Sequence, residues 1–130
     1  METAALLITA LLFGGMVLYA FGFAAFVFSA LPAETAGPLI RQAFPHFYLF
    51  VIITGGTGAA VLAITDAVSA LLLAITALST IPIRQNLMPA INAATDAGNK
   101  GRFRRLHGVS VAATLAHIGL VSAVLIRFVN

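Results

Sequence analysis

Four long apolar runs constrain what this chain can fold into. They lie at about residues 4–31, 47–65, 67–88 and 106–129. A helix needs about 20 apolar residues to cross the hydrocarbon core of a bilayer, so each run is close to or above that length. Only 8% of the 130 residues are Asp, Glu, Lys or Arg, whereas a soluble domain has about 25%. The sequence therefore predicts one integral membrane domain, residues 1–130, folded as an all-α bundle of four transmembrane helices.

The segment between the first two runs predicts an additional short helix. Pro38 suits the first position of a helix, and Arg41 and Gln42 then point away from its apolar face. That face is formed by Leu39, Ile40, Ala43 and Phe44. An amphipathic helix of this kind lies in the membrane interface. We expect Pro45 to end it and to let the second span turn into the bilayer.

The basic residues predict how the chain is oriented. With four spans, both termini lie on the side of Asp66, and the two longer loops lie together on the opposite side. Those loops hold Arg41, Arg84, Lys100, Arg102, Arg104 and Arg105. Only Arg127 lies near the other side. Because cytoplasmic loops are enriched in Lys and Arg, we expect the loops in the cytoplasm and both termini outside, as in a bacterial inner-membrane protein.

Polar side chains are predicted to gather where the helices meet the cytoplasmic interface. His46 begins the second helix, Arg84 ends the third and His107 begins the fourth. Asn86 and Thr35 can reach the same layer. Because Arg offers a planar fork that suits phosphate, this layer is a candidate site for an anionic headgroup or a small anion. The alternative is that Arg84 extends to the interface and the histidines cap loops, without a ligand.

His117 is a second candidate, because it lies inside a span. It stands eleven residues into the last run, about 16 Å along the helix axis and close to the middle of the bilayer. An intramembrane ionisable residue is a functional candidate, which here could relay protons, bind a quinone or ligate a metal. A structural role is the alternative, in which a neutral ring bonds a hydroxyl inside the bundle. The hydroxyls at suitable depth belong to Thr54, Thr57, Thr76 and Ser79.

Several motifs resemble the transmembrane protein 205-like family, a group of four-helix membrane proteins classed as a domain of unknown function. The first-loop residues that carry the resemblance are Leu31-Pro32, Thr35, Gly37, Phe44-Pro45 and Phe47-Tyr48. Phe103, His107, Gly108 and Ser110 resemble the family's entry into the last helix, and Arg84 with Pro89 resembles its exit from the third. His46 and Thr114 depart from the pattern. The resemblance implies architecture rather than chemistry.

Few enzyme signatures occur in the sequence. The acids are Glu2, Glu34, Asp66 and Asp96, which are scattered over both sides, so no metal site is predicted. Nucleophile elbows and phosphate-binding Gly-Lys loops are absent. The sequence therefore favours a non-enzymatic membrane protein that binds lipid, a small hydrophobic ligand or a partner membrane protein through its polar mouth. Nucleic acid is not an expected partner.

Two alternatives remain open on the sequence. His46 and His107 lie at matching depths on different helices, and axial ligation by His is ordinary for haem, so a single-haem b-type electron-transfer protein is one alternative. An accessory subunit of a larger membrane complex is the other, because the loops are small and carry little chemistry. A homo-oligomer is compatible with each of these functions.

Overall fold

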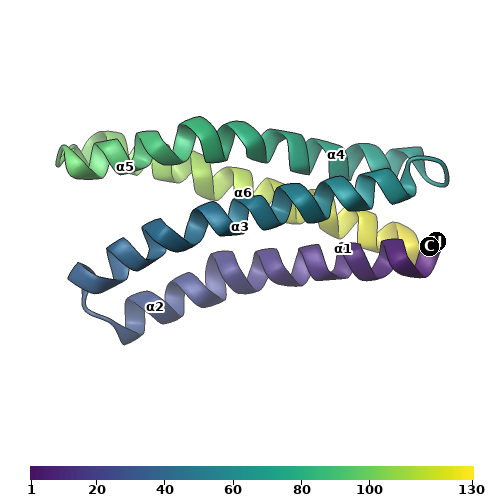
Figure 1. Ribbon diagram of the computed structural model, residues 1–130, viewed down its shortest axis with the longest axis horizontal. Coiled ribbons are helices and arrows are strands. Elements are labelled where there is room, and N and C mark those ends of the chain that lie inside the picture. Colours follow the sequence, from purple (N-terminus) through teal and green to yellow (C-terminus); the bar gives the residue numbers. More distant parts are fainter.

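The computed structural model describes residues 1–130 and shows four long helical columns packed side by side (Figure 1). Each column has 29 or 30 residues, or about 45 Å at 1.5 Å per residue. All four are long and apolar enough to cross a membrane, and the predicted all-α four-helix bundle is confirmed. The elements are α1 (Glu2–Val17), the π-helical segment η1 (Leu18–Phe23), α2 (Ala24–Ala30), α3 (Ala33–Leu62), α4 (Ala67–Pro82), the π-helical segment η2 (Ile83–Leu87), α5 (Met88–Asp96) and α6 (Lys100–Val129).

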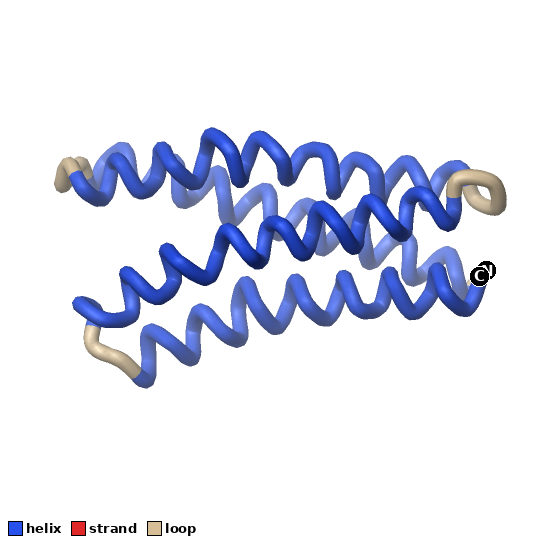
Figure 2. The backbone as a smooth tube through the Cα atoms, viewed as in Figure 1, coloured by secondary structure: helices blue, strands red, loops and turns tan.

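Short loops join the columns in an antiparallel arrangement (Figure 2). Both chain termini and the α3–α4 loop lie at one end of the bundle (Figure 1). We call this the Asp66 end, comprising residues 1–5, 62–69 and 124–130. The other two loops lie at the opposite end, which we call the basic end, comprising residues 28–46 and 84–107.

The predicted interfacial helix is the part of the fold that the structure corrects. Residues 38–44 do not form a separate helix but belong to α3, which runs unbroken from Ala33 to Leu62 with two prolines inside it. Pro45 removes one backbone hydrogen bond, and a single loss of this kind can bend a helix without ending it. A contact with the first column also holds these turns in line, because the Tyr19 hydroxyl donates to the Ala43 carbonyl at 2.9 Å.

The polar stretch between the third and fourth columns is helical rather than a long loop. Only Ala97–Asn99 separates α5 from α6. Gly98 adopts φ +66°, a conformation in which glycine avoids the strain of a side chain. The Asn99 amide bonds the Ala94 carbonyl at 3.0 Å, and the Gly98 amide bonds the Thr95 carbonyl at 3.1 Å. This is a Schellman cap, and it turns the chain back within three residues.

Most buried residues follow a spacing of three and four along every column, which is the heptad pattern of left-handed helical bundles. They are Ala5, Thr9, Leu12 and Met16 in α1; Tyr48, Val51, Gly55, Gly58 and Leu62 in α3; Ser69, Leu73, Thr76 and Thr80 in α4; and His117, Val121 and Val124 in α6. Many large apolar side chains outside these seams are exposed. An apolar outer surface is what lipid-facing helices require, because lipid gives no drive to bury it.

Close packing of α3 on α4 depends on glycine. A Cβ at Gly58 would lie 2.8 Å from Cδ1 of Leu73, and a Cβ at Gly55 would lie 3.3 Å from Cβ of Ala77. Small residues let helix backbones approach each other in a membrane, where van der Waals contact drives association. These glycines therefore serve helix packing.

Candidate functional site

Arg84 is the best-positioned residue of the predicted polar mouth. It lies in η2, the π-helical segment that follows Pro82, and its side chain is half-buried. Nε donates to the Pro45 carbonyl at 3.2 Å, which ties the η2 segment to α3. This bond fixes the plane of the guanidinium, while the two terminal amino groups make no hydrogen bond and Arg84 takes part in neither of the ion pairs.

The other four candidates are exposed and are not hydrogen-bonded to Arg84. His46 directly follows the residue that accepts the Arg84 bond, so the backbone brings these two positions together. His107 stacks on Phe103 along α6, with the ring centroids 5.3 Å apart and 9° between the planes. Asn86 and Thr35 lie on the exposed surface of the same end. Ligand binding by this set therefore stays a prediction, as does haem ligation by His46 and His107.

Arg41 forms an ion pair at the basic end that was missed by the sequence analysis, where Arg41 served to predict orientation and the polar side of a short helix. Nη2 of Arg41 lies 2.9 Å from Oδ1 of Asp96 and also donates to the Asn92 carbonyl at 3.2 Å. The pair joins α3 to α5, 55 positions apart in the sequence. The sequence showed that both residues lie toward the same end of the bundle, but it did not show that α5 extends the third column far enough to bring Asp96 next to Arg41.

His117 lies in the interior, where its side chain meets a hydroxyl. The residue is 8% exposed, and Nε2 lies 2.7 Å from Oγ of Ser79 in α4. The Ser79 hydroxyl donates its own proton to the Ile75 carbonyl at 2.6 Å, so the histidine Nε2–H is the donor in the shared bond. Ser79 is one of the four hydroxyls that the sequence offered.

The hydroxyl of Tyr48 lies 3.2 Å from Oγ of Ser110, which forms a second polar contact between columns, here α3 and α6. Thr114 donates to the Ser110 carbonyl at 3.0 Å. Positions 110, 114 and 117 occupy the α6 seam toward the basic end, whereas Val121 and Val124 continue it toward the Asp66 end. The core is therefore polar in one half of α6 and apolar in the other.

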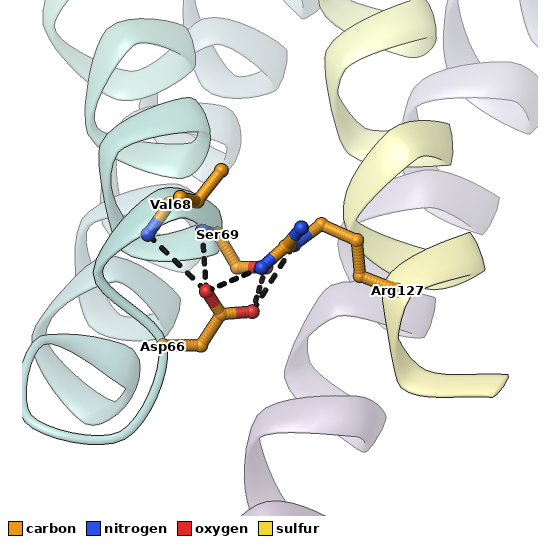
Figure 3. A network of polar contacts seen from close by, with 4 residues as sticks. All are labelled: Asp66, Val68, Ser69 and Arg127. Carbon is orange, nitrogen blue, oxygen red and sulfur yellow. Dashed lines mark hydrogen bonds and ion pairs between the residues drawn. The ribbon is translucent and has the colours of Figure 1, made fainter. Parts of the chain in front are cut away.

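Asp66 organises a second polar site that the sequence analysis also missed (Figure 3). Its carboxylate accepts from the backbone amides of Val68 and Ser69 at 3.2 Å and from the Ser69 hydroxyl at 2.5 Å. Arg127 adds Nη2 at 2.9 Å and Nε at 3.2 Å. The bonds from Arg127, and then those from Ser69, hold the pKa of the Asp66 carboxyl well below its usual range.

This network both caps a helix and joins two columns. Asp66 is the N-cap of α4, a position where a carboxylate satisfies free backbone amides. Its bonds to Arg127 tie the start of α4 to the last turn of α6. A cavity of about 90 Å³ opens beside the network, lined also by Glu2, Thr65 and Phe128.

An apolar groove of about 400 Å³ runs along the first column, toward the basic end. Gly15, Tyr19, Gly22 and Phe26 line it on one helical face. Tyr19 also stacks on Phe47, with ring centroids 5.1 Å apart. The groove therefore lies at the level of the α3 turn that holds Pro45.

No three His, Cys, Asp or Glu side chains come close enough together to hold a metal ion. The fold and the polar residues define a membrane protein with four helices able to span a bilayer. The chain belongs to the family described as the domain of unknown function DUF4149, which matches residues 7–100. The matched region contains Arg84, His46, Asn86 and Thr35, but ends where α6 begins, before His107 and His117. No curated protein and no solved structure matches the chain.

Proposed function

We propose that this protein binds membrane lipid without catalysing a reaction, and that Arg84 holds the phosphate of an anionic phospholipid at the basic end. One observation carries the proposal. The Nε–H of Arg84 is fixed on the Pro45 carbonyl while both terminal amino groups are left without a partner. A guanidinium held in this way offers two parallel donors, the geometry that suits phosphate oxygens.

The depth of Arg84 supports a headgroup as the ligand. Arg84 comes 18 positions after Asp66 in the same column, which corresponds to about 27 Å along the helix. The hydrocarbon core of a bilayer is about 30 Å thick. If Asp66 lies at one face of that core, the Arg84 backbone lies just inside the other face, and its long side chain can extend from there to the lipid phosphates.

Charge at the basic end supports an anionic lipid over a neutral one. Asp96 already pairs with Arg41, which leaves a set of exposed cations without carboxylate partners. They are Lys100, Arg102, Arg104 and Arg105. Basic clusters next to a transmembrane helix attract anionic lipid, with about 1 kcal/mol per residue. His46 and His107 border the same layer and would add hydrogen bonds to the headgroup.

Lipid retention tests this proposal. The protein is reconstituted in nanodiscs with equal phosphatidylglycerol and phosphatidylcholine, released into mild detergent and examined by native mass spectrometry. Charge-assisted hydrogen bonds contribute about 1.5–3 kcal/mol, so we expect Arg84→Gln to lower phosphatidylglycerol retention about tenfold. Arg84→Lys keeps the charge but loses the planar fork, so its phosphatidylglycerol retention should lie between that of the wild type and that of Arg84→Gln. Arg102→Gln removes one charge of the exposed cluster, so it should cost no more than the general attraction of about 1 kcal/mol. A loss equal to that of Arg84→Gln would reject a specific site at Arg84.

The orientation of the chain is part of the proposal. The excess of basic residues favours the basic end in the cytoplasm and both termini outside, which in a bacterium corresponds to the inner membrane. Reporter fusions after Asn99 and after Asn130 should then give opposite sidedness, with the Asn99 fusion cytoplasmic. A cytoplasmic signal from the Asn130 fusion would contradict the orientation.

A hydrophobic ligand is a second candidate, favoured by the groove on the first column. Its lining is mostly apolar, and Gly22 leaves it open near Leu18. Gly22→Phe should fill the groove and lower co-purification of any neutral lipid or hydrophobic small molecule seen with the wild type. Retention unchanged in this variant would exclude the groove as the binding site. The narrower resemblance to the transmembrane protein 205-like family is compatible with both candidates.

A further inference from the structure

The cavity at the Asp66 end has free acceptors and shares no residue with the site at Arg84. Its volume is about 90 Å³. A water molecule needs about 10–15 Å³ of such space, so a small polar group fits.

The charged side chains that line the cavity are Glu2, Asp66 and Arg127, and together they carry one net negative charge. Asp66 and Arg127 neutralise each other across the bundle, whereas Glu2 also lines the cavity and takes part in neither ion pair. Thr65 lines the same space, and its hydroxyl makes no hydrogen bond in the structure. One carboxylate and one hydroxyl therefore remain available to accept hydrogen bonds.

The aromatic wall adds a second attraction for a cation. Phe128 lines the cavity together with Glu2, and the face of an aromatic ring attracts ammonium groups. A primary ammonium carries three N–H donors, which match the free carboxylate and hydroxyl. A quaternary ammonium has no N–H donor and would leave the hydroxyl unused.

We propose that this cavity binds a primary ammonium group, as carried by a phosphatidylethanolamine headgroup. Glu2 and Thr65 accept from the ammonium, and Phe128 covers it. The Nη1 group of Arg127 makes no hydrogen bond, because Asp66 and Ser69 engage Nε and Nη2. It is therefore free to meet the phosphate that lies next to the ammonium in such a lipid.

Competition between two zwitterionic lipids tests the proposal. The protein is reconstituted in nanodiscs with equal phosphatidylethanolamine and phosphatidylcholine, and the lipids it retains in mild detergent are counted by native mass spectrometry. Exposed charge pairs contribute about 0.2–1 kcal/mol, so we expect a preference for phosphatidylethanolamine of about threefold. Glu2→Gln should abolish the preference. Glu34→Gln, an exposed acid at the basic end, should leave it intact.

A free amine is the other source of the same chemistry, and a separate arm distinguishes it. Ethanolamine is added to protein in pure phosphatidylcholine nanodiscs, and binding is followed by chemical shifts of the Thr65 and Glu2 amides. Shifts in the wild type but not in Glu2→Gln would support the ammonium site with a soluble ligand. Equal retention of the two lipids together with no shift by ethanolamine would overturn the proposal. The site at Arg84 is tested with phosphatidylglycerol and the Arg84 variants, whereas this cavity is tested with phosphatidylethanolamine and Glu2→Gln. The failure of one proposal therefore leaves the other standing.

Discussion

The two ends of the bundle use charge in opposite ways. At the Asp66 end the carboxylate accepts from two backbone amides, one hydroxyl and one guanidinium, so the carboxylate has all its partners within the bundle. At the basic end Asp96 meets Arg41 alone among charged groups, and the terminal amino groups of Arg84 are left without a partner. The ion pair at the Asp66 end therefore stabilises the fold, whereas the unpaired cations at the basic end are available to a ligand.

Removing Asp66 should lower the stability of the protein more than any other single change considered at either end of the bundle. Asp66→Ala takes away five hydrogen bonds and the N-cap of α4, and it leaves Arg127 without its carboxylate partner. We expect a fall of several degrees in the thermal midpoint in detergent. Asp96→Ala, the matched change at the basic end, should move the midpoint much less. Equal shifts for the two variants would contradict the contrast between the ends.

His117 sits between the two ends and tests the polar half of the core. His117→Ala removes a buried ring and leaves Ser79 without its cross-column bond, so we expect a loss of about 2 kcal/mol in the free energy of unfolding. His117→Gln can still donate to Ser79 and should retain most of the stability. Steric trapping in bicelles measures both. A Gln variant as unstable as the Ala variant would show that the hydrogen bond is unimportant there.

The pH dependence of stability tests the role of Asp66 as an ionised partner of Arg127 and Ser69. Because Arg127 and Ser69 lower the pKa of Asp66 in the folded state, its contribution is fully present above the ordinary carboxyl pKa of about 3.9. It is lost only as pH falls below that value toward the folded-state pKa. The stability difference between wild type and Asp66→Asn should therefore stay constant from pH 8 to about pH 5 and then shrink. A difference that changes near neutral pH would contradict the assignment.

The smallest effect is expected at the exposed pair of the basic end. The side chains of Arg41 and Asp96 are 39% and 65% exposed, and pairs of this kind contribute about 0.2–1 kcal/mol. A double-mutant cycle with Arg41→Gln and Asp96→Asn should give a coupling in that range. The coupling should weaken as salt is raised. A larger coupling that does not depend on salt would show that this pair stabilises the fold as much as the Asp66–Arg127 pair does.

The sequence predicted the bundle because span length and charge are properties of local composition. It failed at the boundaries between helix and loop for two different reasons. Pro45 was expected to end a helix, but contacts across the bundle keep its neighbours helical. Residues 89–105 are polar and were expected to be a loop, but all except Ala97–Asn99 are helical, because a polar composition does not exclude a helix.

The sequence could predict the level along the bundle at which the candidate site residues lie, but not the groups to which they bond. Arg84 and His46 could be assigned to one layer by counting residues along two helices. The bond from Arg84 to the Pro45 carbonyl depends on a backbone oxygen, which no residue pattern reveals. The pairing of Asp66 with Arg127 was equally hidden, because the two positions are 61 apart and their approach depends on how the last column closes the bundle.

Lipid binding as proposed requires contact between the Arg84 guanidinium and a lipid phosphate, and solid-state NMR can measure this contact. Protein with ¹⁵N-labelled arginine side chains is placed in bilayers containing phosphatidylglycerol, and dephasing of the guanidinium nitrogens by ³¹P is recorded. Arg84→Lys serves as the reference, since it removes only the nitrogens in question. We predict that the wild type shows dephasing from a phosphate in direct hydrogen-bonding contact, and that this part is lost in the variant. Identical dephasing in the two proteins would contradict the account.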